Sequence, residues 1–161
     1  MKIGFIGLGN LGRAICSRLS SLGDELIVYN RNKDKIKDLP YQAANTPKDI
    51  LKECDVIFLC LFDSPAVENI LSGENGILCD ELKGKTIIDL TTNHYEDVLK
   101  FHKMVNAIGG NYLENPVFGS VAPALNGALT VVSSGKTEVF ANVKPILEKI
   151  AVEIFHLEAP S

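Results

Sequence analysis

Long apolar runs are absent from this chain: no eighteen consecutive residues are apolar, which is about the length that a membrane-spanning helix needs. The N-terminus carries a strand-like segment and no signal sequence, so we expect a cytoplasmic protein that contacts no membrane. An excess of one charge is also absent. The formal net charge is −4, and this balance argues against a nucleic-acid partner. No repeat or low-complexity segment divides the 161 residues, which are enough for one domain.

Cysteine is equally sparse. The four cysteines are scattered, with neither a C-x-x-C pair nor a spacing typical of a metal site. We therefore expect free thiols and no bound metal. Cys60 falls in an apolar run, where a thiol packs as a small core residue. The others are Cys16, Cys54 and Cys79.

What the sequence does contain is a glycine pattern close to its start. An apolar run over 3–6 predicts a buried parallel strand, and Gly7, Gly9 and Gly12 follow in the spacing G-x-G-x-x-G. Apolar residues then recur at three- and four-residue steps until Gly23, a left-handed cap, so a helix is predicted. In such a turn the first glycine permits the sharp bend. The second lets a pyrophosphate approach the backbone, and the third lets the helix pack close to the strand.

We interpret this strand, turn and helix as a dinucleotide-binding fingerprint, because a second strand-like run over 25–30 follows. The N–H groups at the start of the helix would face the phosphates. One alternative is a glycine-rich turn that binds nothing, and another is a domain that binds FAD or a different nucleotide through the same glycines. The predicted cofactor contacts in this turn are Gly7, Leu8, Gly9, Asn10, Leu11 and Gly12.

The acidic residue that ends the second strand of many dinucleotide-binding domains is absent. Such an acid accepts hydrogen bonds from the adenosine ribose, but here the strand ends in Asn30, Arg31 and Asn32. A carboxylate would repel a 2′-phosphate, whereas a guanidinium pairs with it through two parallel hydrogen bonds. We therefore predict Arg31 as the 2′-phosphate ligand, with Asn30 or Asn32 beside it, and NADP(H) rather than NAD(H) as the cofactor. Lys35 and Lys37 are interpreted as the solvated face of a short helix.

Strand-like and helix-like segments alternate along nearly the whole chain, which predicts a Rossmann-type α/β fold: a doubly wound, mostly parallel sheet with helices on both faces. The run 55–61 is apolar on both faces, as a central parallel strand should be. Other strands are expected at 41–43, 85–90, 111–117, 128–134 and 154–155, helices at 46–52, 64–71, 94–108 and 139–149, and a loop at 118–127.

Ligands of such sheets lie outside the carboxyl ends of the strands. We therefore expect Leu61, Phe62 and Asp63 to contact the cofactor through backbone groups and the Phe62 ring.

Past the strand 85–90, hydroxyls and an amide at 91–93 could orient a nicotinamide carboxamide or a substrate. The alternative is that Thr91 or Thr92 caps the helix that begins near His94. The sequence leaves both readings open. The three histidines are isolated and are interpreted as surface or packing residues; they are His94, His102 and His156.

With these residues in hand, the chain resembles the N-terminal domain of the β-hydroxyacid dehydrogenase family, which includes 3-hydroxyisobutyrate, 6-phosphogluconate and tartronate-semialdehyde enzymes. The resemblance extends over essentially the entire sequence. It depends on the segments 3–12, 29–31, 55–61, 88–92 and 115–117.

The resemblance implies further site residues. Thr92 matches a cofactor-contacting threonine of the family, and Phe62 stands where the family usually has a proline beside the cofactor. Val67, on the following helix, completes the predicted cofactor contacts.

The segment 118–120 corresponds to the family's substrate loop. Phe118 replaces a serine that binds the substrate carboxylate, and Gly119 and Ser120 begin a Gly-Ser-x-x-Pro-Ala pattern similar to that of the glyoxylate and succinic semialdehyde reductases, which use NADPH.

The resemblance also implies that the catalytic lysine lies beyond the last strand of this domain, on the way into a helical second domain. Residues 1–161 are therefore expected to form only the dinucleotide-binding domain, with no catalytic residue, and Lys144 and Lys149 are interpreted as solvated. The intact protein would transfer hydride between NADP(H) and a small hydroxy acid, semialdehyde or keto acid. The alternative is a non-catalytic dinucleotide-binding or interaction module. Formation of a homo-oligomer is left open.

Overall fold

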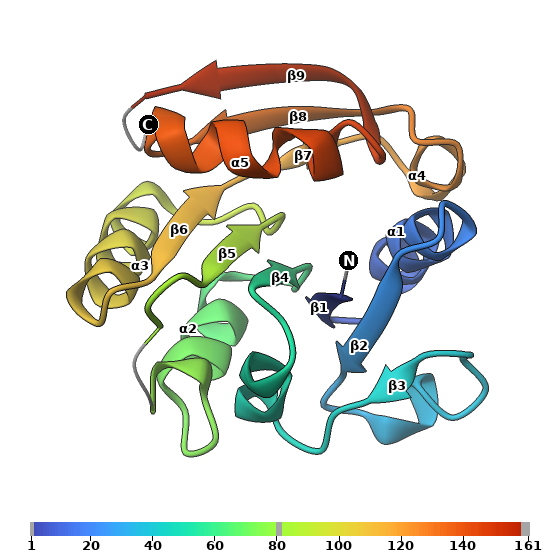
Figure 1. The fold of residues 1–161 in the computed structure, drawn as a ribbon, viewed down its shortest axis with the longest axis horizontal. Coiled ribbons are helices and arrows are strands. Elements are labelled where there is room, and N and C mark those ends of the chain that lie inside the picture. Colours follow the sequence, from blue (N-terminus) through green and yellow to red (C-terminus); the bar gives the residue numbers. More distant parts are fainter. Residues whose placement is uncertain (1, 80–81, 159–161) are drawn as a thin grey trace.

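A computed structural model describes residues 2–79 and 82–158 as one sheet flanked by helices (Figure 1). The strands are β1 (Lys2–Ile6), β2 (Glu25–Tyr29), β3 (Gln42–Ala43), β4 (Val56–Leu59), β5 (Thr86–Asp89), β6 (Asn111–Glu114), β7 (Val117–Phe118), β8 (Leu129–Ser134) and β9 (Ala151–Leu157). The α-helices are α1 (Asn10–Ser21), α2 (Ser64–Ser72), α3 (Tyr95–Ala107), α4 (Val121–Leu125) and α5 (Thr137–Leu147). Short 3-10 helices are η1 (Lys33–Lys35), η2 (Pro47–Lys52) and η3 (Ile77–Cys79).

The strand order is β3-β2-β1-β4-β5-β6-β8-β7, with β9 paired to β8. The first six strands are parallel, whereas β8 runs antiparallel to β6 and β7. From β1 the chain moves outward to β2 and β3, then returns to form β4 on the other side of β1. This reversal creates a switch point at the carboxyl ends of β1 and β4, where ligands of such sheets bind. The prediction of a doubly wound, mostly parallel sheet is confirmed.

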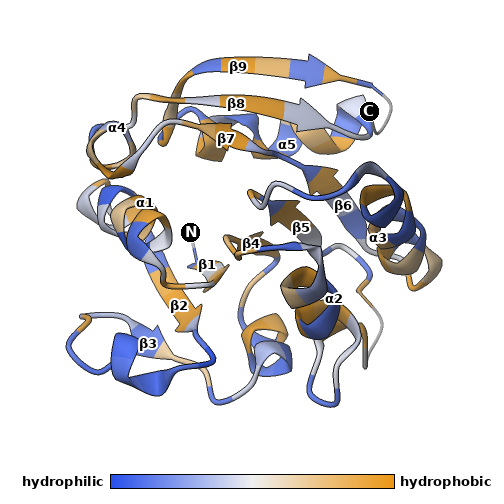
Figure 2. Ribbon diagram, turned by 180° about the vertical axis from the view of Figure 1, so that it is seen from behind, coloured by the Kyte–Doolittle hydropathy of each residue, from blue (hydrophilic) through white to orange (hydrophobic). Residues whose placement is uncertain are grey.

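Alternation along the strands produces two hydrophobic cores, one on each face of the sheet. Ile3 and Phe5 pack with residues of α1, α4 and α5, whereas Ile6 packs with residues of η2, α2 and α3. The Phe5 ring stacks on that of Phe58 with centroids 5.8 Å apart. In Figure 2, β2 is largely hydrophobic and the region around β3 is hydrophilic, as expected for a strand at the sheet's edge. In the residues that the structure describes, no helix could cross a membrane.

Several predicted elements differ in type or length. The expected loop 118–127 contains α4, whose Ala124 is fully buried; five residues are too few for a periodic pattern to be recognised. The helix predicted over 46–52 is the 3-10 segment η2, which begins where the Asp49 carboxylate accepts hydrogen bonds from the Thr46 backbone N–H and hydroxyl. The strand predicted over 111–117 is split in two at Pro116, which has no N–H for the ladder.

Lys149 was expected to be solvated, and this prediction is wrong. Its ammonium donates to both carboxylate oxygens of Asp24, at 2.7 and 2.6 Å. The Arg18 guanidinium donates to the Lys149 carbonyl at 3.0 Å. These contacts join the end of α1 and the start of β2 to the chain after α5, so they tie the two halves of the domain together.

The described cysteine side chains are free thiols, as predicted. Burial raises the pKa of Cys60 to about 12 and the pKa of Cys54 to about 11, so both remain protonated at neutral pH. The side chain of Cys79 lies outside the described part of the structure.

His102, on α3, is a packing residue. The sequence predicted either a surface or a packing role for it. Its ring meets Tyr112 edge-on with centroids 4.8 Å apart, and within the described ranges its buried Nε2 has no hydrogen-bond partner. Burial lowers the pKa of His102 to about 4 from its ordinary 6.5. The folded protein therefore holds this ring neutral.

We expect His102 to make folding sensitive to mild acid. Below pH 6.5 the His102 ring becomes protonated in the unfolded chain, whereas in the folded protein it stays neutral until about pH 4. The free energy of unfolding therefore falls between these two pH values. His102→Gln removes this term, so the stability difference between wild type and variant should shrink as pH falls. Urea unfolding at about pH 7.5 and about pH 5 measures it. A difference independent of pH would contradict a neutral buried His102.

Candidate functional site: the carboxyl edge around the glycine turn

Gly7 and Gly12 are required by the fold itself. Gly7 has a φ of 103°, which other residues rarely adopt, and a Cβ there would overlap the Cys60 carbonyl oxygen. A Cβ on Gly12 would overlap the carbonyl oxygen of Gly7. Gly9 differs, because its φ is −67° and no atom lies within 4 Å of the place its Cβ would take. Its missing side chain therefore serves no packing purpose and keeps open space beside the turn.

The N-terminus of α1 faces this open space, and no side chain of the described residues caps it. The first helical hydrogen bond runs from the Arg13 N–H to the Gly9 carbonyl at 2.9 Å, so the N–H groups of Asn10, Leu11 and Gly12 precede the ladder. The helix has no side-chain cap and no acidic residue in its first turn. These N–H groups and the positive end of the helix dipole form a site suited to an anion.

The end of β2 is tied to the glycine turn through Asn30. Its Oδ1 accepts from the Leu8 N–H at 2.9 Å, and its Nδ2 donates to the Asn32 carbonyl at 2.8 Å. Asn32 caps η1, where its Oδ1 accepts from the Asp34 N–H at 3.0 Å. The side-chain amides of Asn30 and Asn32, which were predicted to lie beside the 2′-phosphate, therefore form hydrogen bonds with backbone groups. The Leu8 side chain is buried.

Arg31 lies exposed between these two asparagines. In residues 2–79 and 82–158, its guanidinium forms neither a hydrogen bond nor an ion pair. The neighbouring Lys33 contrasts with it: the Lys33 ammonium donates to the carbonyls of Ala44 and Asn45 at 3.1 and 3.0 Å and lies 4.4 Å from the centre of the Tyr29 ring. Arg31 is thus the cation at this strand end that is available to a ligand.

The turn after β4 lies next along this edge. Asp63 caps α2 by accepting from the Ala66 N–H at 2.9 Å, and Phe62 is 94% exposed. Val67 is fully buried in the core beneath α2, so the structure turns this predicted contact away from the open edge. Leu61 is partly buried, and its N–H donates to the Thr91 hydroxyl at 3.1 Å.

The turn after β5 decides in part between the two interpretations of Thr91 and Thr92, which were a ligand contact and a helix cap. The capping alternative is wrong, because α3 begins at Tyr95 and its N-cap is His94. Thr91 is 2% exposed and holds the neighbouring turn through the Leu61 N–H. Thr92 is exposed at the edge, where the predicted contact needs it.

Asp89 is a functional candidate that the sequence reading missed. Its side chain has no exposed surface, and its carboxylate accepts from the Thr91 N–H at 2.9 Å, from Asn93 Nδ2 at 2.9 Å and from the Tyr112 hydroxyl at 2.6 Å. Burial raises the pKa of Asp89, and these hydrogen bonds oppose that rise. The pKa of Tyr112 is also raised, by burial and by the adjacent carboxylate. The sequence feature that could have identified Asp89 was an acidic residue within the otherwise apolar run 87–90.

The predicted substrate segment is exposed throughout. Phe118, at the end of β7, is 61% exposed, Gly119 has a φ of 137°, and Ser120 is the N-cap of α4 without a side-chain cap bond. From here α4 packs against α1, so the segment leads back to the helix that starts at the glycine turn (Figure 1).

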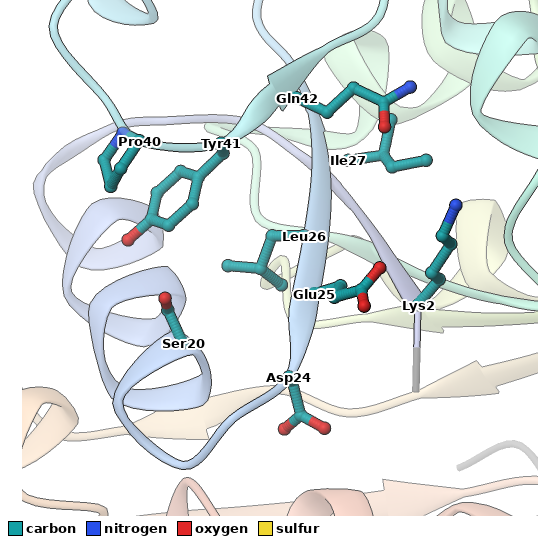
Figure 3. Close-up of a pocket in the computed structure, with 9 residues that line it drawn as sticks. All are labelled: Lys2, Ser20, Asp24, Glu25, Leu26, Ile27, Pro40, Tyr41 and Gln42. Carbon is teal, nitrogen blue, oxygen red and sulfur yellow. The ribbon is translucent and has the colours of Figure 1, made fainter.

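A hollow of about 300 Å³ lies elsewhere, at the amino ends of β1 and β2 (Figure 3). It is lined in part by Lys2, Asp24 and Tyr41, and by none of the predicted site residues. Lys2 is paired with Glu53 at 2.7 Å and Asp24 with Lys149 at 2.6 Å. Because it faces away from the switch point, we do not assign the cofactor to it.

A glycine turn and an uncapped helix end at the switch point of a parallel sheet define a dinucleotide-binding Rossmann domain. Comparison with known proteins specifies the class further. The family model described as the NAD binding domain of 6-phosphogluconate dehydrogenase matches residues 2–157, and the chain belongs to that family.

Named relatives agree with this assignment. The chain is 36% identical to 2-hydroxy-3-oxopropionate reductase of Escherichia coli K12 over 156 residues, which cover 96% of this chain and 53% of the relative. It is 30% identical to glyoxylate/succinic semialdehyde reductase 1 of Arabidopsis thaliana over 160 residues, covering 98% and 55%. A solved structure of Psf3 in complex with NADP+ and 2-OPP matches with a TM-score of 0.93 at 32% identity, covering 98% of this chain and 57% of that one.

The chain therefore spans about half the length of the curated relatives it matches. The resemblance predicted from the sequence is confirmed: this is an NAD(P)-binding domain of the hydroxyacid dehydrogenase-like reductases.

Substitution of Gly9 should separate binding from folding. A Cβ at Gly9 meets no protein atom, so Gly9→Ala should cost less than about 1 kcal/mol of stability, the usual range for an N-cap change. It should weaken NADPH binding at least about tenfold, because the methyl group occupies the space that a pyrophosphate would need. Urea unfolding and a fluorescence titration with NADPH measure the two effects.

Gly12→Ala is the matched control. Its Cβ would overlap the Gly7 carbonyl oxygen, so we expect about 1–3 kcal/mol of destabilisation from overpacking. A Gly9→Ala protein that binds NADPH like wild type would show that the phosphates do not lie against this turn.

Proposed function

We propose that this domain binds NADP(H) in preference to NAD(H), with Arg31 as the ligand of the 2′-phosphate. The observation that carries the proposal is the exposed Arg31 guanidinium, which has no partner among the described residues although Lys33 beside it is held by two carbonyls. Asn30 ties this strand end to the glycine turn through the Leu8 N–H. The NADP+ in the Psf3 complex is consistent with this preference.

Different described residues would contact different parts of the cofactor. The open space at Gly9 and the N–H groups that begin α1 would hold the pyrophosphate. The turn at 61–63 and the exposed Thr92 would contact the nicotinamide half, through backbone groups and the Phe62 ring. When bound, NADP(H) supplies or accepts the hydride, while the domain provides binding and orientation.

The intact protein, in this proposal, reduces or oxidises a small hydroxy acid, semialdehyde or keto acid. The names of the two reductases above support this substrate class. The segment 118–120 would contact the substrate, and the exposed Phe118 ring adds apolar surface where the family's serine would offer a hydroxyl.

The proton donor would be a lysine that residues 1–161 do not supply. Two candidates from this chain are engaged elsewhere, because Lys149 is paired with Asp24 at 2.6 Å and Lys144 lies 3.8 Å from Glu148 on α5. Neither is at the carboxyl edge.

Charge reversal at Arg31 tests the cofactor preference. Arg31→Asp should weaken NADPH binding by on the order of 1.5–3 kcal/mol, the value of a charge-assisted hydrogen bond, which is about ten- to more than a hundredfold in affinity. Binding of NADH should change little. Lys35→Asp is the control, because it makes the same charge change at an exposed position four residues away. Equal losses of NADPH and NADH in Arg31→Asp would contradict the assignment.

Turnover by the isolated chain tests the origin of the proton donor. The 161-residue protein should bind NADPH but reduce glyoxylate or succinic semialdehyde very slowly, because in this proposal the acid that protonates the developing alkoxide is not among these residues. Loss of NADPH absorbance measures the rate. Ordinary enzymatic rates would show that a residue of this chain donates the proton, and their loss in His94→Gln would identify that residue.

A further inference from the structure

Two turns meet at the part of the edge assigned to the nicotinamide half. One follows β4 and leads from Leu61 to Ser64, the first residue of α2, and the other follows β5 and contains Thr91, Asn93 and His94. Phe62, between Leu61 and Ser64, is 94% exposed, whereas Ser64 and Thr91 are buried. Hydrogen bonds between polar groups join the two turns.

Those hydrogen bonds link the turns at two places. The Leu61 N–H donates to the Thr91 hydroxyl at 3.1 Å, and the Ser64 hydroxyl donates to Asn93 Oδ1 at 3.1 Å. The same Ser64 oxygen accepts from the His94 N–H at 3.1 Å. The bonds thus hold both ends of the first turn, on either side of Phe62.

Thr91 and Asn93 are held in turn by one carboxylate. Asp89 Oδ1 accepts from the Thr91 N–H, and its Oδ2 accepts from Asn93 Nδ2, both at 2.9 Å. Oδ2 also accepts from the Tyr112 hydroxyl at 2.6 Å, which approaches from β6 and belongs to neither turn. Asp89 has no exposed surface, so water cannot replace any of these bonds.

An amide side chain at this position cannot accept the same set of hydrogen bonds. In Asp89→Asn, one oxygen becomes an NH2 group, which must point either at the Thr91 N–H or at Asn93 Nδ2. In both orientations a donor faces a donor in a buried place, so the turn after β5 loses its anchor at Thr91 or at Asn93.

We propose that Asp89 is a positioning residue for the nicotinamide half of the cofactor site. Its carboxylate holds the turns after β4 and β5 in one relative arrangement, and it touches neither cofactor nor substrate. The inference rests on the proposed function, because it concerns the same edge. It adds that the two halves of the site are built separately: Gly9 and Arg31 lie outside the Asp89 network.

Two probes distinguish the adenosine half of the cofactor site from the nicotinamide half in the full 161-residue chain. NADPH contains both, whereas 2′-phospho-ADP-ribose keeps the adenosine and pyrophosphate and has no nicotinamide. Asp89→Asn should bind 2′-phospho-ADP-ribose within about twofold of wild type and lose NADPH affinity about tenfold or more. The emission of bound NADPH, which reports the surroundings of the reduced ring, should shift toward that of the free nucleotide.

Tyr112→Phe is the matched control. It removes the third hydrogen bond to the same carboxylate and leaves both turns anchored, so both affinities should stay within about twofold of wild type. Hydrogen exchange without ligand gives a second readout. The amides of Leu61 and Thr91 should exchange about tenfold faster in Asp89→Asn and unchanged in Tyr112→Phe.

Thr91→Val provides a milder test should Asp89→Asn fold poorly. It keeps the shape of the side chain and removes the acceptor for the Leu61 N–H, so a selective loss of NADPH affinity of about threefold is expected. Equal losses for both probes in these variants, or no loss, would overturn the positioning role. Equal affinity of the wild type for the two probes would also overturn it. Failure of the wild type to bind either probe would instead overturn the proposed function, and this inference with it.

Discussion

The close approach of α1 to the first strand is the constraint on which this site depends. Gly7 and Gly12 leave no room for a side chain, because Cβ atoms there would overlap the carbonyl oxygens of Cys60 and Gly7. This contact aims the start of α1 across the switch point between β1 and β4. Gly9 then lies where the fold needs no glycine, so the space beside it is left open for the ligand in the proposed site. Folding and binding thus use different glycines of one short motif.

In the proposed cofactor site, the remainder of the edge uses two different kinds of interaction. Its adenosine side is built from backbone N–H groups and one exposed cation, with Asn30 joining the glycine turn to the strand that carries Arg31. Its nicotinamide side is built from a buried carboxylate and the polar side chains around it. An exposed cation can be lost without disturbing the fold, whereas a buried carboxylate is coupled to every group it holds. Cofactor choice and cofactor orientation are therefore separable properties of this domain.

Sequence patterns predicted the elements with strong local signals. Most strands and the helices α1, α2, α3 and α5 were recovered because each carries an apolar periodicity or a clear boundary residue, whereas β7 was not predicted as a separate strand. Short elements were missed or given the wrong type, since α4 has five residues and η2 has six. Val67 was predicted to contact the cofactor, but on α2 it is fully buried in the core. Periodicity identifies a buried face and cannot say what that face covers.

The sequence by itself determined the fingerprint and the ligand class that it predicts through residues that are close in the chain: three glycines within six positions, and a strand end with arginine where an acid is usual. Only the tertiary structure decided which polar residues act together. Asp89 meets Tyr112 from 23 positions away, Leu61 meets Thr91 across 30, and Lys149 meets Asp24 across 125. The physical reason is that parallel strands bring distant residues to one edge, and no local pattern records which neighbour each strand will have.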